Sequence, residues 1–167
     1  MGYDFVVEYN TLDSGKHPYW SKIILLRKLL DLDYDYVMFI DADAIFTDFG
    51  AGLDKFINGS SIYIANENIS RCAGFGENSG VILLRNDDMS RQFLTDVLGR
   101  YNECKNNCTP EQLAIAIEVE GKYNNYTTQY PCLWFNAYYG KFAEDIRRPW
   151  CLWRPGCYIK HVLMSSS

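Results

Sequence analysis

The segment YVMFIDADAIFTDFG, residues 36–50, places two carboxylates, Asp41 and Asp43, directly after a short and fully apolar run. Apolar runs of this length are typical of strands that are buried in an α/β sheet. In open α/β sheets, ligands bind beyond the carboxyl ends of the strands. The segment therefore predicts a strand over residues 36–40 that ends at a binding site.

Patterns on both sides of this segment predict alternating strands and helices. The expected strands, from β-branched and aromatic runs, cover residues 3–10, 61–68 and 79–86, with short strands near 156–164. The expected helices, from apolar spacing and capping residues, cover residues 19–32, 87–103 and 109–120, with a helix or turn over 49–58. This alternation predicts one α/β domain over residues 1–167, with a mixed, mainly parallel sheet flanked by helices.

Charge and hydropathy argue against two broad classes of protein. The net charge is −5 and there is no long basic run, which argues against a nucleic-acid-binding protein. The longest apolar stretches have the length of a strand or a short helix, so no transmembrane segment is expected. An acidic chain that binds a phosphate-bearing ligand is expected to need a bridging cation.

The pair Asp41 and Asp43 suits such a cation. Two residues that are two positions apart on an extended strand share a face, so both carboxylates are expected to point the same way. Like charges repel unless a cation lies between them, and Mg²⁺ and Mn²⁺ take carboxylate oxygens as ligands. The small Ala42 would let a bulky ligand approach the backbone. The alternative is a solvated loop with scattered acids, and the preceding apolar strand favours the metal site.

Two neighbouring motifs resemble a known enzyme family. HPYWSKIILLRKLL (17–30), followed by YVMFIDADAIFTD (36–48), is similar to the retaining galactosyl-, mannosyl- and xylosyltransferases of the yeast mannan and plant xyloglucan pathways. More broadly, the chain resembles the metal-dependent A-type glycosyltransferases, which use nucleotide sugars. The resemblance is specific over residues 17–48 and looser to about residue 115.

The resemblance implies a metal and a donor substrate. Asp41, Asp43 and His161 would hold Mn²⁺ or Mg²⁺, and the donor would be a UDP- or GDP-linked sugar. At His161 the chain departs from the family, because HVLMSSS replaces a histidine followed by a glycine and a basic residue or cysteine. Lys22 stands where the family precedent implies a contact to the donor; the alternative is a solvated lysine on a helix.

Two later segments extend the resemblance. NSGVILLRN (78–86) implies that Asn78 and Gly80 lie against the sugar or the acceptor, because an amide donates and accepts hydrogen bonds and glycine allows close approach. PEQLAIAI (110–117) implies that Glu111 and Gln112 are the catalytic residues near the reacting carbon, with Glu111 where the family has aspartate. The alternatives are an ordinary turn and ordinary helix capping.

Together these features predict a metal-dependent glycosyltransferase that moves a hexose or pentose from a nucleotide diphosphate sugar to a glycan hydroxyl, with retention. Folds of this type begin with a strand that holds the base, whereas residues 3–10 look like a later strand. An N-terminal unit or a partner chain would then complete the base-binding site.

Two other functions stay open at this stage. One is a non-catalytic nucleotide-sugar or glycan-binding domain on the same scaffold. The other is a haloacid-dehalogenase-type phosphatase with Asp41 as nucleophile, although Ile45 stands where such enzymes have threonine or valine. The expected location is the Golgi or secretory lumen for a full-length eukaryotic family member, and otherwise the cytoplasm.

Overall fold

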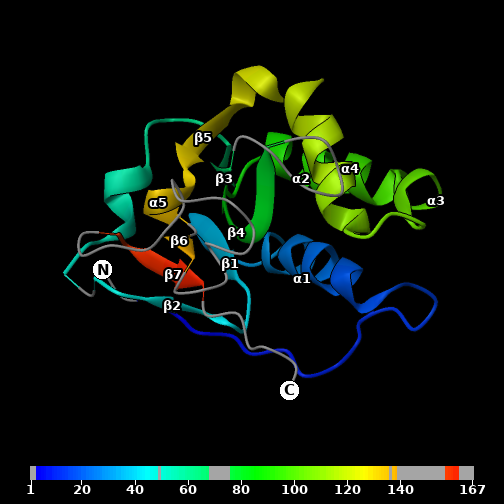
Figure 1. The fold of residues 1–167 in the computed structure, drawn as a ribbon, viewed down its shortest axis with the longest axis horizontal. Helices are drawn as coiled ribbons and strands as arrows, with labels where there is room; N and C mark the ends of the chain where they lie inside the picture. The colour runs from blue at the N-terminus through cyan, green and yellow to red at the C-terminus, as the bar shows by residue number, and fades with distance from the viewer. Residues whose placement is uncertain (1–2, 49, 68–75, 136, 139–156, 162–167) are drawn as a thin grey trace.

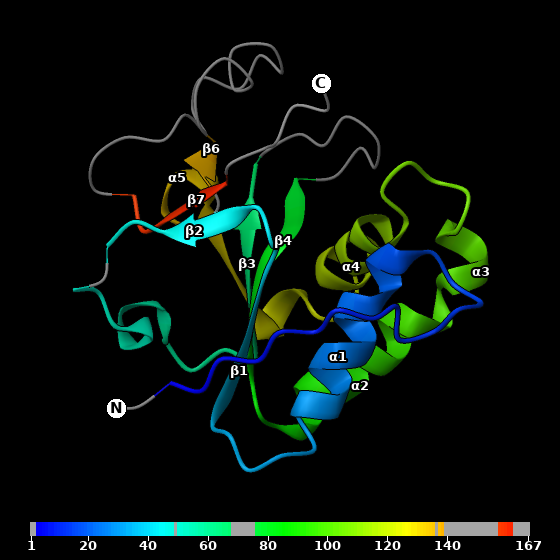
Figure 2. The ribbon, with the colours of Figure 1, turned by 90° about the horizontal axis from the view of Figure 1, so that it is seen from below.

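A computed structural model of the chain describes residues 3–48, 50–67, 76–135, 137–138 and 157–161, with only the backbone described at Tyr138 and His161. Its elements form three layers, with a helical layer and a small sheet on opposite faces of a larger sheet (Figures 1 and 2). This is the α/β architecture that the alternation of strands and helices predicts.

The larger sheet has the strand order β1–β4–β3–β5. In that order its strands are β1 (Tyr36–Ile40), β4 (Glu77–Arg85), β3 (Ile62–Asn66) and β5 (Thr127–Pro131). Both β1 and β3 are antiparallel to β4, and β5 is parallel to β3, so β1, β3 and β5 run in one direction. The predicted mixed and mainly parallel sheet is confirmed. The expected strand over residues 36–40 is present, but it is less buried than expected, because β1 lies at the edge of the described sheet and only Val37 is fully buried.

The smaller sheet has the order β2–β7–β6. Its strands are β2 (Ala44–Phe46), β7 (Ile159–His161) and β6 (Ala137–Tyr138), and η2 (Leu53–Phe56) and α5 (Cys132–Phe135) are the short helices of this part of the molecule. The short strand predicted near the C-terminus and the helix or turn predicted over residues 49–58 are confirmed.

The helical layer carries the other predicted helices. Its elements are η1 (Pro18–Trp20), α1 (Ser21–Leu29), α2 (Asp88–Gly99), α3 (Tyr101–Cys104), α4 (Pro110–Glu120) and η3 (Asn124–Tyr126). The single helix predicted over residues 87–103 is two helices, because Arg100 leaves helical geometry, with φ −81° and ψ 5°. Within the described ranges, no helix is both long and apolar enough to cross a lipid bilayer.

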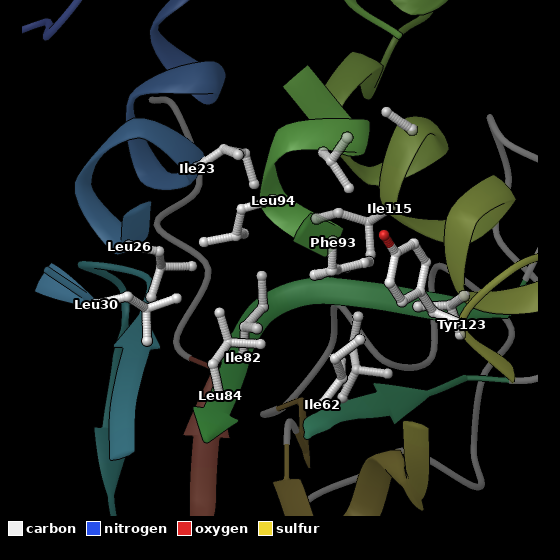
Figure 3. Close-up of a cluster of buried hydrophobic side chains, with 14 of the residues drawn as sticks. Ile23, Leu26, Leu30, Ile62, Ile82, Leu84, Phe93, Leu94, Ile115 and Tyr123 are labelled. Carbon is white, nitrogen blue, oxygen red and sulfur yellow. The ribbon is translucent and has the colours of Figure 1, made fainter. Parts of the chain in front are cut away.

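The central strands β3 and β4 are apolar on both faces because each face covers a separate core. Alternate residues of a strand point to opposite faces. Ile62 and Ile64 of β3 therefore pack with the helices, whereas Tyr63 and Ala65 pack on the side of the smaller sheet. Figure 3 shows the helix-side core, in which Ile82 and Leu84 of β4 also lie. Because both faces of β3 and β4 are buried, the larger sheet is packed between the helical layer and the smaller sheet.

The strand predicted over residues 3–10 is wrong. This segment is extended but belongs to no sheet, and its apolar side chains are exposed, with Phe5 83% and Tyr9 90% exposed. It is held by side-chain contacts, in which Tyr34 donates to Asp4 (3.0 Å) and the Leu53 N–H donates to the Tyr3 hydroxyl (3.2 Å). An apolar, β-branched sequence becomes a strand only where a neighbouring backbone pairs with it, and in the described part of the chain none does.

An ion pair joins α2 to the segment after α4 and predicts how stability depends on pH. Asp96 accepts hydrogen bonds from Lys122 and Tyr123, both at 2.7 Å, and these lower the pKa of Asp96 to about 2. A carboxyl whose pKa is lowered on folding stabilises the folded state above its unfolded pKa, and this stability is lost as pH falls through the folded pKa. We expect a loss of at most about 2 kcal/mol between pH 4 and pH 2, because the pair is partly solvated.

Urea unfolding between pH 5 and pH 2 tests this expectation. Asp96→Asn should lower stability at pH 5 and should flatten its dependence on pH in the acid range. Asp33→Asn, at an exposed carboxylate in the loop before β1, is the control and should follow wild type. If the free energy of unfolding of Asp96→Asn and of wild type falls equally between pH 5 and pH 2, the pair of Asp96 with Lys122 and Tyr123 does not cause the pH dependence.

Candidate functional site

The Asp-Ala-Asp segment forms a tight turn at the end of β1. The Asp41 N–H donates to the Gly80 carbonyl (2.8 Å), and the Ala44 N–H donates back to the Asp41 carbonyl (3.0 Å). The chain therefore reverses over residues 41–44 and enters β2. The strand ends at Ile40 as predicted, but the extended geometry on which a shared face for Asp41 and Asp43 depends does not continue, because this turn replaces it. Both carboxylates are nevertheless partly exposed and line one cavity.

This cavity is large and unites most of the predicted site. Its volume is about 2650 Å³, well above the roughly 300–1,000 Å³ that is typical of small-molecule sites. The predicted site residues that line it are Lys22, Asp41, Ala42, Asp43, Asn78, Gly80, Glu111 and Gln112. The first helix, the β1–β2 turn, the start of β4 and the start of α4 thus converge on one space.

Lys22 is the centre of a charge network at this site. Its side chain is only 9% exposed, and its Nζ lies 3.2 Å from Asp41 Oδ1 and 3.2 Å from Glu111 Oε1. It also donates to the carbonyl and the hydroxyl of Ser79, both at 3.3 Å. One buried ammonium therefore holds a carboxylate of the β1–β2 turn and a carboxylate of α4 close together. The alternative of a solvated helix lysine is wrong.

A bulge in β4 brings Ser79 into this network. Ile64 of β3 pairs with Ile82, but the next residue, Ala65, pairs with Asn78, so residues 79–81 have no counterpart on β3. Bulges re-aim side chains and are frequent beside active sites. Here the Ser79 hydroxyl donates to Glu111 Oε1 at 3.0 Å, and the Ser79 N–H donates to Gln112 Oε1 at 3.3 Å. Ser79 was not among the predicted site residues, although it lies between the predicted Asn78 and Gly80.

Glu111 and Gln112 stand in the first turn of α4, which begins at Pro110, one residue inside the predicted range. Glu111 is only 4% exposed, and Lys22 and Ser79 both contact its Oε1. Its other oxygen, Oε2, is buried without a hydrogen-bond partner in the described part of the chain. A buried carboxylate oxygen without a hydrogen bond lowers the stability of the folded state. Oε2 of Glu111 is therefore a hydrogen-bond acceptor with no donor in the described part of the chain.

Glu67 is a second residue that the sequence analysis missed. It follows β3 directly, lines the same cavity and is 1% exposed. Asn78 connects the two strand ends, since its Nδ2 donates to Glu67 Oε1 (2.6 Å) and its Oδ1 accepts from the Gly80 N–H (2.7 Å). The signal was available, because an acid directly after an apolar strand is the same pattern as Asp41 after β1.

The backbone of His161 lies near the Asp41–Asp43 turn, on strand β7 of the smaller sheet. In the pairing of β2 with β7, His161 is opposite Ala44, the residue that follows Asp43. The His161 side chain lies outside the described part of the structure. Among the side chains that are described, no group of three or more His, Cys, Asp or Glu residues forms a metal-binding cluster. The metal site of Asp41, Asp43 and His161 stays a prediction, supported by the neighbouring backbone positions of Asp43 and His161.

The fold that carries this site is shared with solved glycosyltransferases. The structure matches a glycosyltransferase involved in glycosylation of the major capsid of PBCV-1 with a TM-score of 0.65 and 12% identity, over 95% of this chain and 77% of that one. It also matches the glycosyltransferase GlyE of Streptococcus pneumoniae TIGR4 with a TM-score of 0.55 and 16% identity, over 83% of this chain and 37% of that one. No family model and no curated protein matches the sequence.

A third match is the galactosyltransferase LgtC in complex with donor and acceptor sugar analogs, with a TM-score of 0.53 and 13% identity. That match covers 88% of this chain and 59% of that one, so the chain spans only part of the GlyE and LgtC structures. The chain therefore has a glycosyltransferase fold, and the predicted A-type glycosyltransferase architecture is confirmed. At these identities the likeness establishes the fold, and the activity follows only by proposal.

Proposed function

We propose that this chain is a glycosyltransferase domain that moves a sugar from a nucleotide diphosphate sugar to a hydroxyl of a glycan. The observation that carries the proposal is the cavity at the carboxyl end of β1. On a glycosyltransferase fold, it gathers the Asp41–Asp43 turn, the Lys22–Glu111 network and Glu67. Acidic and amide groups bind hydroxyls directly, and the acidic groups bind a diphosphate through a bridging cation.

A divalent cation, Mn²⁺ or Mg²⁺, is part of the proposal. Asp43 and His161 would hold it, with Asp41 on the metal or on the ribose, and this set of carboxylate oxygens and one imidazole is one that Mn²⁺ accepts. When bound, the metal would act as a Lewis acid that stabilises the leaving diphosphate.

The chain's own polar groups would recognise the sugar. Glu111 Oε2 and the Gln112 side chain would bind hydroxyls near the reacting carbon, and Asn78 would bind hydroxyls of the sugar or the acceptor. Glu67 is held by Asn78 and would add a further hydroxyl acceptor. Lys22 would act mainly by positioning Asp41 and Glu111, because both carboxylates form ion pairs with its ammonium group.

Retention at the anomeric carbon is proposed from the family resemblance. Glu111 is the candidate nucleophile, but Lys22 and Ser79 both hold its Oε1. A front-face route, in which the leaving phosphate takes the acceptor's proton, needs no protein nucleophile. A binding domain without catalysis is the second candidate function, and it is favoured by the departure of HVLMSSS from the family's pattern after His161. Phosphatase activity is not proposed, because the matched structures described above are glycosyltransferases.

Calorimetric titration with UDP and GDP, with Mn²⁺ and with EDTA, tests the proposal. We expect one of the two nucleotides to bind in the presence of Mn²⁺ and to bind much more weakly in EDTA. Turnover of that nucleotide's sugars would then separate the enzyme from the binding domain. Binding of neither nucleotide to the intact, folded protein with Mn²⁺ would refute the donor site.

A further inference from the structure

Three described segments carry the triplet Asn-x-Ser/Thr, which is the acceptor sequence for N-linked glycans. These triplets begin at Asn58, Asn107 and Asn125. A fourth, at Asn68, lies outside the described residues. Such a triplet arises by chance in many chains, so it indicates a modification site only where the folded protein leaves the asparagine amide exposed and without another role. The three described asparagines differ in this respect.

Asn107 is poorly placed to carry a glycan. It is only partly exposed, and its Oδ1 accepts a hydrogen bond from the Thr109 N–H at 3.1 Å. The hydroxyl of Thr109, the third residue of the triplet, is buried. Thr109 also lines the cavity of the proposed site, so a glycan on Asn107 would stand beside that cavity.

Asn58 is exposed, but the fold uses its side chain. Its Nδ2 donates to the Thr128 hydroxyl at 2.9 Å, and its Oδ1 accepts from the Ser60 N–H at 3.3 Å. These bonds tie the segment before β3 to the start of β5. A sugar on Nδ2 would replace one of its two hydrogens and would have to fit beside Thr128. We therefore assign Asn58 a structural role.

Asn125 is exposed, and its side chain forms no hydrogen bond within the described residues. It lies in η3, the turn that leads into β5 and that Figure 1 shows in yellow at the upper edge of the molecule. The acids of the proposed site follow the carboxyl ends of β1 and β3, whereas Asn125 precedes the amino end of β5, which runs in the same direction. A strand of this length spans roughly 16 Å, so a glycan on Asn125 would leave the cavity open.

The cysteines give independent evidence for the compartment. Cys108 and Cys132 are both disulfide-bonded. Disulfides persist in oxidising environments, such as the lumen of the endoplasmic reticulum and the exterior of the cell, and are rare in the cytosol. The acceptor triplet for N-linked glycans is used in proteins of this secretory route. Disulfide bonding and an exposed triplet at Asn125 therefore point to the same history of the chain.

We propose that Asn125 carries an N-linked oligosaccharide. In this modification, Nδ2 of Asn125 loses a proton and forms a bond to the anomeric carbon of an oligosaccharide, and the lipid diphosphate that carried the oligosaccharide leaves. The glycan would stand beside Tyr126, whose side chain is 43% exposed. The inference goes beyond the proposed function and does not rest on it, because this chain is here the acceptor and its cavity takes no part.

Mass spectrometry of the intact protein from its source tests the assignment. Peptide N-glycosidase in heavy-oxygen water converts each glycosylated asparagine into a labelled aspartate, and a sample without the enzyme controls for spontaneous deamidation. We expect the label at Asn125 and none at Asn58 or Asn107. An unlabelled Asn125 would overturn the proposal, and so would a label at Asn58 or Asn107 in its place.

Variants of the triplet give a second readout in the intact protein made by its source cells. Asn125→Gln and Thr127→Ala should each lower the mass of the protein by one glycan, whereas Thr127→Ser keeps the required hydroxyl and should keep the glycan. The Thr127 hydroxyl also donates to the Tyr123 carbonyl at 2.9 Å, so urea unfolding checks that each variant is folded. Asn58→Gln is the matched control and should keep the wild-type mass of glycan. An unchanged mass of glycan in Asn125→Gln would refute the proposal, whatever the result of nucleotide titration.

Discussion

Replacing Lys22 with methionine is expected to lower the free energy of unfolding by about 3 to 5 kcal/mol. Methionine keeps much of the length of the side chain but leaves two carboxylates without their shared cation. Glu111 is 5% exposed at its side chain and Asp41 is 30% exposed, so only Asp41 can turn to water for compensation. We therefore expect the loss to lie toward the lower end of that range, with most of it arising at Glu111.

A double-mutant cycle with Glu111→Gln separates this charge effect from lost packing. Once Glu111 is neutral, removing Lys22 should cost less, so the double variant should be more stable than the sum of the single losses predicts. Lys28→Met, on the exposed face of the same helix, is the matched control and should shift stability by less than about 0.5 kcal/mol. If urea unfolds Lys22→Met and Lys28→Met at the same midpoint, the network does not stabilise the fold.

Replacing Asp43 with alanine is expected to weaken Mn²⁺-dependent nucleotide binding by at least about 100-fold. Loss of groups that only support metal ligands already costs about 10–100-fold in metal affinity, and Asp43 is proposed as a ligand itself. Calorimetry with the preferred nucleotide measures the binding, and urea unfolding measures the stability.

The control for Asp43→Ala is Glu120→Ala, at an exposed carboxylate at the far end of α4. It changes the net charge equally, so a purely long-range electrostatic effect would appear in both variants. We expect Glu120→Ala to bind the nucleotide as wild type does. Mn²⁺-dependent binding that survives in Asp43→Ala would remove this residue from the metal site and would leave Asp41 as the only acid of the turn to consider.

The sequence predicted most of the local elements because local patterns encode them. The apolar runs that become β3 and β4, the helix predicted over residues 109–120 and the apolar run before Asp41 each lie where expected. The same patterns predicted that Asp41, Asn78 and Glu111 belong to strand and helix ends, and the structure brings these ends to one cavity. Glu67 was missed although its position after β3 carries the same signal as Asp41.

What the sequence alone determined is therefore the list of strands and helices near the site and the residue types at their ends. Only the tertiary structure decided that residues 3–10 form no strand and that β1 pairs antiparallel with β4. It alone joined Lys22 to both Asp41 and Glu111, and turned the chain at Asp41–Ala44. The physical reason is that propensity and periodicity are properties of neighbours in sequence. Strand partners and buried charge pairs depend instead on which distant backbones and side chains the packed core brings together.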